Sequence, residues 1–397
     1  MARSSLPAGA LAVLGTGLFG IGLAVGGYGA SVTALIEQGV AADVAGFGMT
    51  IYLLGQVVAA LPADRLTRRY GPRRVVVGGF AVGTAGAIIG GTLDLRLVYL
   101  SRVLLGVGTS AALLAGLKYA GHRTDRESRS LAQGLLGGAF TLGLAGGLVA
   151  GPPLLARYGP VALALLAAIV TAAPAALVLR LEAVPTDPVR RVASYLAPLR
   201  STTGIVLGLA NMMSFGLLIV ATTWYGDVLG TEPTLPATVI LLGFSLATVG
   251  GRFGGGWIAR ALNERAAVAL TLGLLCLLLG GAAAAIAIDA PLVLGVMLLG
   301  TGAGFGLPFG PLFGLAFSNL ADDAGLTLVT MMVIGNAGAL VYPWLIGRSL
   351  RQTGSYTSGF LLMALSVGVV VVLLVLTIGL GSLPSPSSGD ADVAGGR

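Results

Sequence analysis

Charged side chains inside long apolar stretches are the first candidates for chemistry in this sequence. Arg102, Lys118 and Arg252 are each flanked by apolar residues, and no Asp or Glu lies well inside such a stretch. A charge in an apolar environment is costly, so it is usually paired or functional. Three cations without a matching acid favour a site for a small anion, with an organic carboxylate and an inorganic oxyanion both open.

Residue types that most enzymes need are scarce. The chain has one histidine, His122, one cysteine, Cys276, and no Gly-x-x-x-x-Gly-Lys-Ser/Thr sequence for nucleotide phosphates. A single cysteine excludes an intrachain disulfide, and one His with one Cys argues against a transition-metal site. We therefore expect no enzyme activity, no cofactor and no metal, with a membrane-embedded receptor or enzyme as the alternative of another class.

The elements that must position these residues are transmembrane helices. The chain is 56% hydrophobic and 10% charged, whereas soluble domains carry about 25% charged residues. A bilayer is crossed by about 20 apolar residues in a helix, and twelve segments have this character. They are 8–30, 45–62, 75–93, 97–119, 131–153, 160–180, 201–222, 236–258, 266–287, 291–317, 325–346 and 358–381. The sequence predicts an all-α membrane protein with twelve transmembrane helices.

The basic residues predict the orientation of these helices. With the N-terminus inside the cell, sixteen of the 23 basic residues fall in inner loops and termini, four in outer loops and three within spans. Positive residues collect on the cytoplasmic side of membrane proteins, so both termini are expected to be cytoplasmic in the cell membrane. The same pattern accounts for the net charge of +7 without a nucleic-acid partner.

A longer polar loop divides the predicted helices into two sets of six, and the two sets resemble each other. Segment 97–116 aligns with 292–310 through a shared Leu-Leu-Gly-x-Gly core. Repeated six-helix units are typical of transporters whose substrate lies between the halves. The predicted parts are an N-terminal bundle at 1–180, a central cytoplasmic loop at 181–200, a C-terminal bundle at 201–381 and a disorder-prone tail at 382–397.

The charged stretch ADRLTRRYGPRR, residues 63–74, resembles the loop between helices 2 and 3 of the major facilitator superfamily. Its family pattern is Gly-x-x-x-Asp-Arg-x-Gly-x-Arg-Arg, in which Asp64 takes the place of the first glycine and Arg68 that of the aspartate. The acid is therefore displaced by one helical turn. The resemblance implies two pseudo-symmetric six-helix bundles and a cytoplasmic gating loop, made of Asp64, Arg65, Arg68, Arg69, Gly71, Arg73 and Arg74.

Two roles for this stretch remain open. As a gate, Asp64 would meet the positive end of a neighbouring helix or pair with Arg68 four residues on, and the arginines would bind acids such as Asp125 or Glu127 in one conformation. As an anchor, the arginines would only hold the loop at the cytoplasmic surface.

A second resemblance to the superfamily lies in helix 4, where Arg102, Gly106 and Gly108 match its Arg-x-x-x-Gly-x-Gly pattern. It implies that Arg102 faces the interior and takes part in substrate binding or coupling. The alternative is that the long side chain extends to the membrane surface.

Segment 131–153 matches part of the helix-5 motif of exporters in the same superfamily. The matching residues are Gly138, Gly147, Gly151 and Pro152, and the closing glycine pair of the motif is absent. Close helix packing with a proline kink is the alternative explanation.

Further candidates for substrate or coupling contacts are Asn336 of helix 11 and polar or aromatic residues of helices 1, 4, 7 and 10, which line the cavity in this superfamily. Asn336, in a Gly-Asn-x-Gly sequence, is reminiscent of nitrate/nitrite porters, although those carry an arginine in helix 2 that segment 45–62 lacks. Proline at 308 and 311 is expected to bend helix 10. The remaining candidates are Tyr28, Asn211, Ser214, Phe305 and Phe309, each of which packing alone would also explain.

The function expected from these observations is secondary active transport of a small solute, an anion, by alternating access. The partners would be the small-molecule substrate, the lipid bilayer and a coupling ion or counter-substrate, for a protein that acts as a monomer. Export of drug-like or apolar metabolites is the alternative, supported by the partial helix-5 motif. Neither substrate nor direction of transport follows from the sequence.

Overall fold

The computed structural model describes residues 8–123, 126–186, 188, 200–230, 235–319 and 324–379, and every regular element in these ranges is a helix. The first half contains α1 (Ala8–Gly26), α2 (Tyr28–Glu37), α3 (Ala42–Tyr70), α4 (Pro72–Ile89), α5 (Leu95–Arg123), α6 (Arg126–Tyr158), α7 (Pro160–Ala172) and α8 (Ala175–Arg180). The second half contains α10 (Thr202–Asn211), the π-helix η2 (Met212–Gly216), α11 (Leu217–Val228), α12 (Leu235–Leu262), α13 (Glu264–Ala287), α14 (Pro291–Gly306), α15 (Phe309–Asn319), α16 (Ala324–Ala339), α17 (Tyr342–Thr353) and α18 (Thr357–Ile378).

The helices confirm the class of an all-α membrane protein. In the described ranges, ten helical stretches are long and apolar enough to cross a membrane. Helices α4 and α12 cover the two remaining predicted segments, and α12 contains a shorter apolar helix, Pro236–Arg252. Helices suit this environment because their backbone groups are hydrogen-bonded within one segment. The number of twelve crossings and the side of the termini remain predictions.

Several of these stretches consist of two consecutive helices. Helix α14 ends at Gly306 and α15 begins at Phe309, so the stretch is interrupted at Pro308, where a bend was predicted, whereas Pro311 lies inside α15. Helix α16 ends at Ala339, and α17 begins at Tyr342 with a proline as its second residue. Proline interrupts a helix because it lacks a backbone donor and its ring clashes with the preceding turn.

The second helix is longer than the sequence predicted. Segment 45–62 was expected to end before the charged stretch, yet α3 continues through Tyr70 and ends at Gly71, whose φ is +82°. Glycine adopts this backbone conformation without steric cost, and Pro72 then begins α4. The prediction of a loop at 63–70 is therefore wrong, because nothing in these residues stops a helix before the Gly-Pro step.

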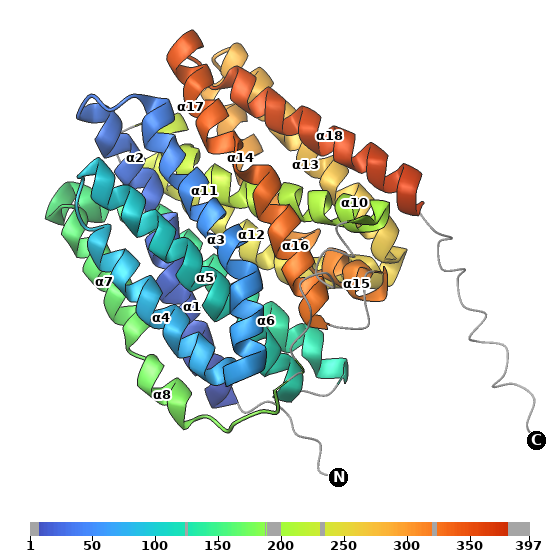
Figure 1. The fold of residues 1–397 in the computed structure, drawn as a ribbon. Helices are drawn as coiled ribbons and strands as arrows, with labels where there is room; N and C mark the ends of the chain where they lie inside the picture. The colour runs from blue at the N-terminus through green and yellow to red at the C-terminus, as the bar shows by residue number, and fades with distance from the viewer. Residues whose placement is uncertain are drawn as a thin grey trace, which may run out of the picture.

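The two halves pack side by side. Figure 1 shows the blue-to-green helices α1–α8 on one side and the orange and red helices α14–α18 on the other, with α3 next to α16 where they meet. Helix α2 packs on α11, and α6 packs on α12, across the same boundary. Residues 187, 189–199 and 380–397, which include most of the predicted central loop and all of the predicted tail, lie outside the described residues.

The packing of α6 on α1 explains two of the predicted helix-5 residues. A Cβ atom built on Gly147 would lie 2.2 Å from the carbonyl oxygen of Leu23, so no side chain fits there. Gly151 is in ordinary contact distance of Ala30, with 3.4 Å from its built Cβ. Small residues that bring backbones this close are typical of membrane helix packing, and Pro152 lies inside the same helix. Gly138 is buried in α6 as well.

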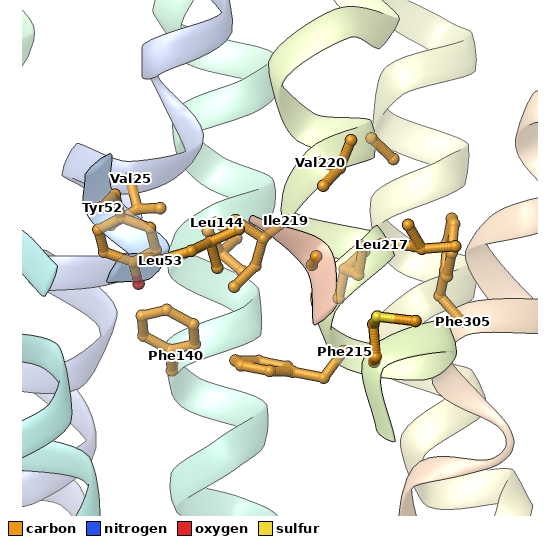
Figure 2. Close-up of a cluster of buried hydrophobic side chains, with 14 of the residues drawn as sticks. Val25, Tyr52, Leu53, Phe140, Leu144, Phe215, Leu217, Ile219, Val220 and Phe305 are labelled. Atoms are coloured by element: carbon orange, nitrogen blue, oxygen red, sulfur yellow. The ribbon is translucent and has the colours of Figure 1, made fainter. Parts of the chain in front are cut away.

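Apolar side chains from both halves fill the middle of the molecule. Figure 2 shows Val25, Leu53, Phe140 and Leu144 of the first half facing Phe215, Leu217, Ile219 and Phe305 of the second. All are buried. The halves therefore share an apolar core in the middle of the molecule.

Candidate functional site

The acid of the charged stretch lies in a buried ion-pair cluster within the first half. Asp64 is fully buried and accepts a hydrogen bond of 2.7 Å from Nε of Arg68, one helical turn further on. The second carboxylate oxygen of Asp64 pairs with the ammonium group of Lys118 from α5. Of the two positions weighed for Asp64, the pair with Arg68 is the one the structure contains.

This cluster corrects two expectations from the sequence. Lys118 was counted among cations without an acid, but it is paired with Asp64. The expectation that no acid is buried is also wrong, because α3 extends past the predicted end and takes Asp64 inside the helix packing. The contact joins α3 to α5, and only the packing of these two helices brings a residue at 64 to one at 118.

The arginines of the stretch divide into buried and exposed members. Arg68 also donates to the carbonyl oxygen of Pro188 at 3.1 Å, and Arg73 donates to that of Leu181. Both acceptors follow α8 in the chain. The other three arginines are exposed, namely Arg65, Arg69 and Arg74. Their proposed partners, Asp125 and the side chain of Glu127, lie outside the described residues.

Glu182, an acid that the sequence analysis did not single out, lies at the end of the first half where Arg73 binds Leu181. Glu182 forms an ion pair of 2.5 Å with Nη1 of Arg123, and its carbonyl oxygen accepts a hydrogen bond of 3.2 Å from Tyr119. The segment after α8 is therefore held against the ends of α3, α4 and α5 by charged and polar contacts.

Arg102 lies in the interior of the first half. Its side chain is 5% exposed, and its guanidinium carbon lies 4.6 Å from the centre of the Tyr28 ring on α2. Tyr28 in turn donates a 2.6 Å hydrogen bond to the carbonyl oxygen of Ala45. The two predicted residues are thus brought together, and the extended position at the membrane surface does not apply to Arg102.

Arg252 lies at the boundary between the halves. Its guanidinium carbon is 3.9 Å from the centre of the Phe309 ring and 5.6 Å from that of Phe215. Its Nη1 donates a long hydrogen bond, 3.4 Å, to the carbonyl oxygen of Gly137 on α6 of the first half. A cation over aromatic faces gains electrostatic stabilisation, which increases when water is excluded.

Neither buried arginine has a carboxylate partner in the part of the chain that the structure describes. The Nε atom of Arg102 and both Nε and Nη2 of Arg252 are buried without a hydrogen-bond acceptor. A buried charge that is left unpaired costs several kcal/mol, on the order of 3–5 where a partner has been removed. The lack of a carboxylate partner distinguishes Arg102 and Arg252 from Lys118, which pairs with Asp64.

Buried amides connect helices both across the boundary and within the second half. Asn336 donates from Nδ2 to Oε1 of Gln56 at 2.8 Å, which joins α16 to α3. Asn211 donates to the carbonyl oxygen of Met331 at 2.9 Å, within the second half. Sequence reasoning missed Gln56, although it is the only amide in segment 45–62 and that property could have identified it.

The halves are joined most directly near the start of α3. Asp43 is buried and pairs with Nη1 of Arg351 on α17 at 3.0 Å. Thr50 donates to the carbonyl oxygen of Leu340 at 2.5 Å. A Cβ built on Gly347 would lie 2.7 Å from the carbonyl oxygen of Ala42. This end of the boundary between α3 and α17 is therefore closed.

Metal binding finds no support among the described residues, where no three His, Cys, Asp or Glu side chains come together. Two helical halves that meet at a boundary containing a buried arginine and buried amides are typical of membrane transporters. The sequence pattern of the Major Facilitator Superfamily matches residues 12–343, and the chain belongs to this family. It is therefore a multi-pass protein of the plasma membrane from a family of transporters, whose members are generally not enzymes.

Known relatives agree with this assignment. The uncharacterized MFS-type transporter YdeG of Bacillus subtilis (strain 168) is 28% identical over 392 residues, which cover 88% of each chain. The uncharacterized MFS-type transporter Rv1877 of Mycobacterium tuberculosis (strain ATCC 25618 / H37Rv) is 28% identical over 367 residues, covering 88% of this chain and 48% of the relative. The chain thus spans about half the length of the Mycobacterium tuberculosis protein.

A solved structure shares the fold. The E. coli fucose:proton symporter FucP (N162A) superposes with a TM-score of 0.65 at 15% sequence identity, covering 92% of this chain and 98% of that one. At this identity the likeness establishes the fold alone.

Proposed function

We propose that the protein is a secondary active transporter that moves a small anion across the plasma membrane by alternating access. The main support is Arg252, a buried cation at the boundary of the halves with two donor atoms that have no acceptor. An anionic substrate would supply that acceptor. Coupling to an ion or a counter-substrate, as in other secondary transporters, is part of the proposal.

Arg102 supports the same substrate class from the first half. It is buried, rests on Tyr28 and retains an Nε without an acceptor. Because Lys118 is neutralised by Asp64, the two arginines are the cations that favour an anion. Desolvated guanidinium groups attract carboxylates and oxyanions more strongly than they would in water.

Alternating access is supported by the contacts that close one end of the boundary. Under the orientation predicted from the basic residues, the pair of Asp43 and Arg351 lies on the outer side. The structure would then be the state that is closed to the outside. Transport requires this pair, the Thr50 contact and the amide contact of Gln56 with Asn336 to separate when the outer side opens.

The alternative is an exporter of drug-like or apolar metabolites. One observation favours it, namely the apolar core between the halves, in which Phe140 and Phe215 face each other (Figure 2). The helix-5 motif adds little to this alternative, because the contact of Gly147 with the backbone of Leu23 explains that glycine by packing.

The proposal is tested by uptake into proteoliposomes with matched probes that differ in charge. Benzoate and nitrate are compared with the neutral benzamide, and the native protein is compared with Arg252→Gln. We expect saturable uptake of at least one anion, little uptake of benzamide and at least a tenfold loss in Arg252→Gln. The control is Arg348→Gln, since Arg348 is exposed and rests on Trp344. Equal uptake of benzamide and the anions would reject the anion proposal and favour the exporter.

A further inference from the structure

The donors that Arg252 leaves unused lie on one edge of its guanidinium group. Nη1 is directed to the carbonyl oxygen of Gly137, whereas Nε and Nη2 are buried without an acceptor. In a planar guanidinium, the N–H of Nε and one N–H of Nη2 point the same way, and their spacing matches the two oxygens of a carboxylate. A carboxylate therefore satisfies both donors with two parallel hydrogen bonds.

A row of aromatic rings lies under this guanidinium group and crosses from one half to the other. Phe309 and Phe215 both lie under the guanidinium, and their ring centres are 6.4 Å apart. Phe140 of α6 follows, with its ring centre 6.2 Å from that of Phe215. Figure 2 shows Phe140 and Phe215 facing each other across the boundary. The row thus has aromatic rings on both sides of the boundary between the halves, which must open during the proposed transport.

Gly137 keeps the space between the arginine and the first half free. A Cβ built at this position would lie 3.4 Å from Nη1 of Arg252 and 3.6 Å from the ring of Phe309. A larger side chain would push the guanidinium away from α6. The arginine consequently reaches the boundary rather than remaining inside its own half.

From this arrangement we infer that the substrate site binds an aromatic monocarboxylate. The carboxylate takes the Nε and Nη2 edge of Arg252, and the substrate ring stacks between Phe140 and Phe215 once the halves separate. The inference rests on the proposed function and narrows its substrate class. An inorganic oxyanion would use the arginine edge but would place a charge against three apolar rings without offering them an apolar surface, which is unfavourable.

Equilibrium binding to the purified full-length protein in detergent tests both the ring contacts and the two-donor contact of Arg252 Nε and Nη2. The probes are benzoate, its saturated analogue cyclohexanecarboxylate, nitrate and benzamide. We expect benzoate to bind about five- to tenfold more tightly than cyclohexanecarboxylate, because aromatic pairs add stabilisation beyond the area they bury. Nitrate and benzamide should each bind at least tenfold more weakly than benzoate.

Variants separate the two parts of the site. Phe215→Leu should abolish the preference for benzoate over cyclohexanecarboxylate, while Phe360→Leu, a buried phenylalanine of α18 outside the row, should retain it. Arg252→Lys keeps the positive charge but loses the two parallel donors, so benzoate affinity should fall at least tenfold. Size-exclusion profiles and melting temperatures of the ligand-free variants verify that each one is folded.

The outcomes distinguish the inference from the proposed function. If nitrate binds as tightly as benzoate, or if cyclohexanecarboxylate does, the aromatic site is rejected and anion transport stands. If Arg252→Lys binds benzoate as the native protein does, the bidentate contact is rejected. If benzamide matches benzoate and Arg252→Gln changes neither, both the inference and the proposed function are rejected.

Discussion

At the scale of single residues, the buried charges fall into two classes with different consequences. Asp64 lies between Arg68 and Lys118, so its charge is compensated inside the first half. Arg102 and Arg252 rest on aromatic rings and keep unused donors. A compensated cluster fixes helix positions, whereas an uncompensated cation can respond to a ligand. We therefore propose that the first class is structural and that the second binds the substrate.

The cluster of Asp64 leads to a prediction about stability. Asp64→Asn leaves two buried cations without their acid, so we expect a free-energy loss on the order of 3 kcal/mol, as for other broken buried pairs. Adding Lys118→Met should restore part of this loss, because the second buried charge is removed as well. Thermal unfolding of the purified variants measures both effects. Equal melting temperatures for Asp64→Asn and the native protein would show that the cluster contributes nothing to stability.

At the scale of elements, the ends and interruptions of helices position the candidate site. Helix α3 stays helical until Gly71 and so turns Asp64 toward α5. Helix α15 begins at Phe309, directly after the interruption at Pro308. The ring of Phe309 lies under the guanidinium group of Arg252. The helix interruption thus places an aromatic ring at the boundary between the halves.

Gly71 provides a test at this scale. Its φ of +82° is strained for any residue with a Cβ, so Gly71→Ala should destabilise the protein by about 1–2 kcal/mol. The matched control is Gly78→Ala in α4, where a built Cβ meets nothing within 4 Å and helix propensity favours alanine. Chemical or thermal unfolding compares the two. Identical stability of both variants would contradict the role of Gly71 as a required helix end.

At the scale of the whole molecule, contacts between the halves decide which state is populated. The pair of Asp43 and Arg351, the Thr50 contact and the amide contact of Gln56 with Asn336 all lie along α3 and its neighbours α16 and α17. They involve side chains as well as backbone carbonyls, so they can break and reform without unfolding a helix. In the proposed mechanism, the transport rate depends on the free-energy difference between the state that contains these contacts and the state in which they are broken.

Charge exchange at Asp43 and Arg351 tests this balance. Asp43→Lys places like charges together and should reduce uptake several-fold, and Arg351→Glu should do the same. The double variant restores an opposite-charge pair, so its uptake should exceed that of either single variant. A double variant that is no better than the single ones would mean that this pair does not act as a gate.

How much of the fold and of the candidate site could be predicted from the sequence depends on how far apart in the chain the interacting residues lie. The apolar segments, the helical class and the two buried arginines follow from the order of residues along the chain. Three contacts did not follow from the sequence, namely the Asp64–Lys118 pair, the Gln56–Asn336 contact and the ring contact of Phe140 with Phe215. Of the rings near Arg252, only Phe309 was a candidate. Each of these contacts joins helices whose relative rotation hydropathy does not specify.

The sequence by itself determined where the chain can enter a membrane and which residues are too polar to lie there without a reason. Hydropathy and charge act locally, so a stretch of about 20 residues contains this information. Only the tertiary structure decided which polar residue meets which, because Gln56 and Asn336 are separated by 280 residues in the chain and meet through the packing of α3 on α16. The packing of α3 on α5 gave Lys118 an acid, whereas Arg252 meets none among the described residues, which is the difference between a structural cation and a candidate substrate ligand.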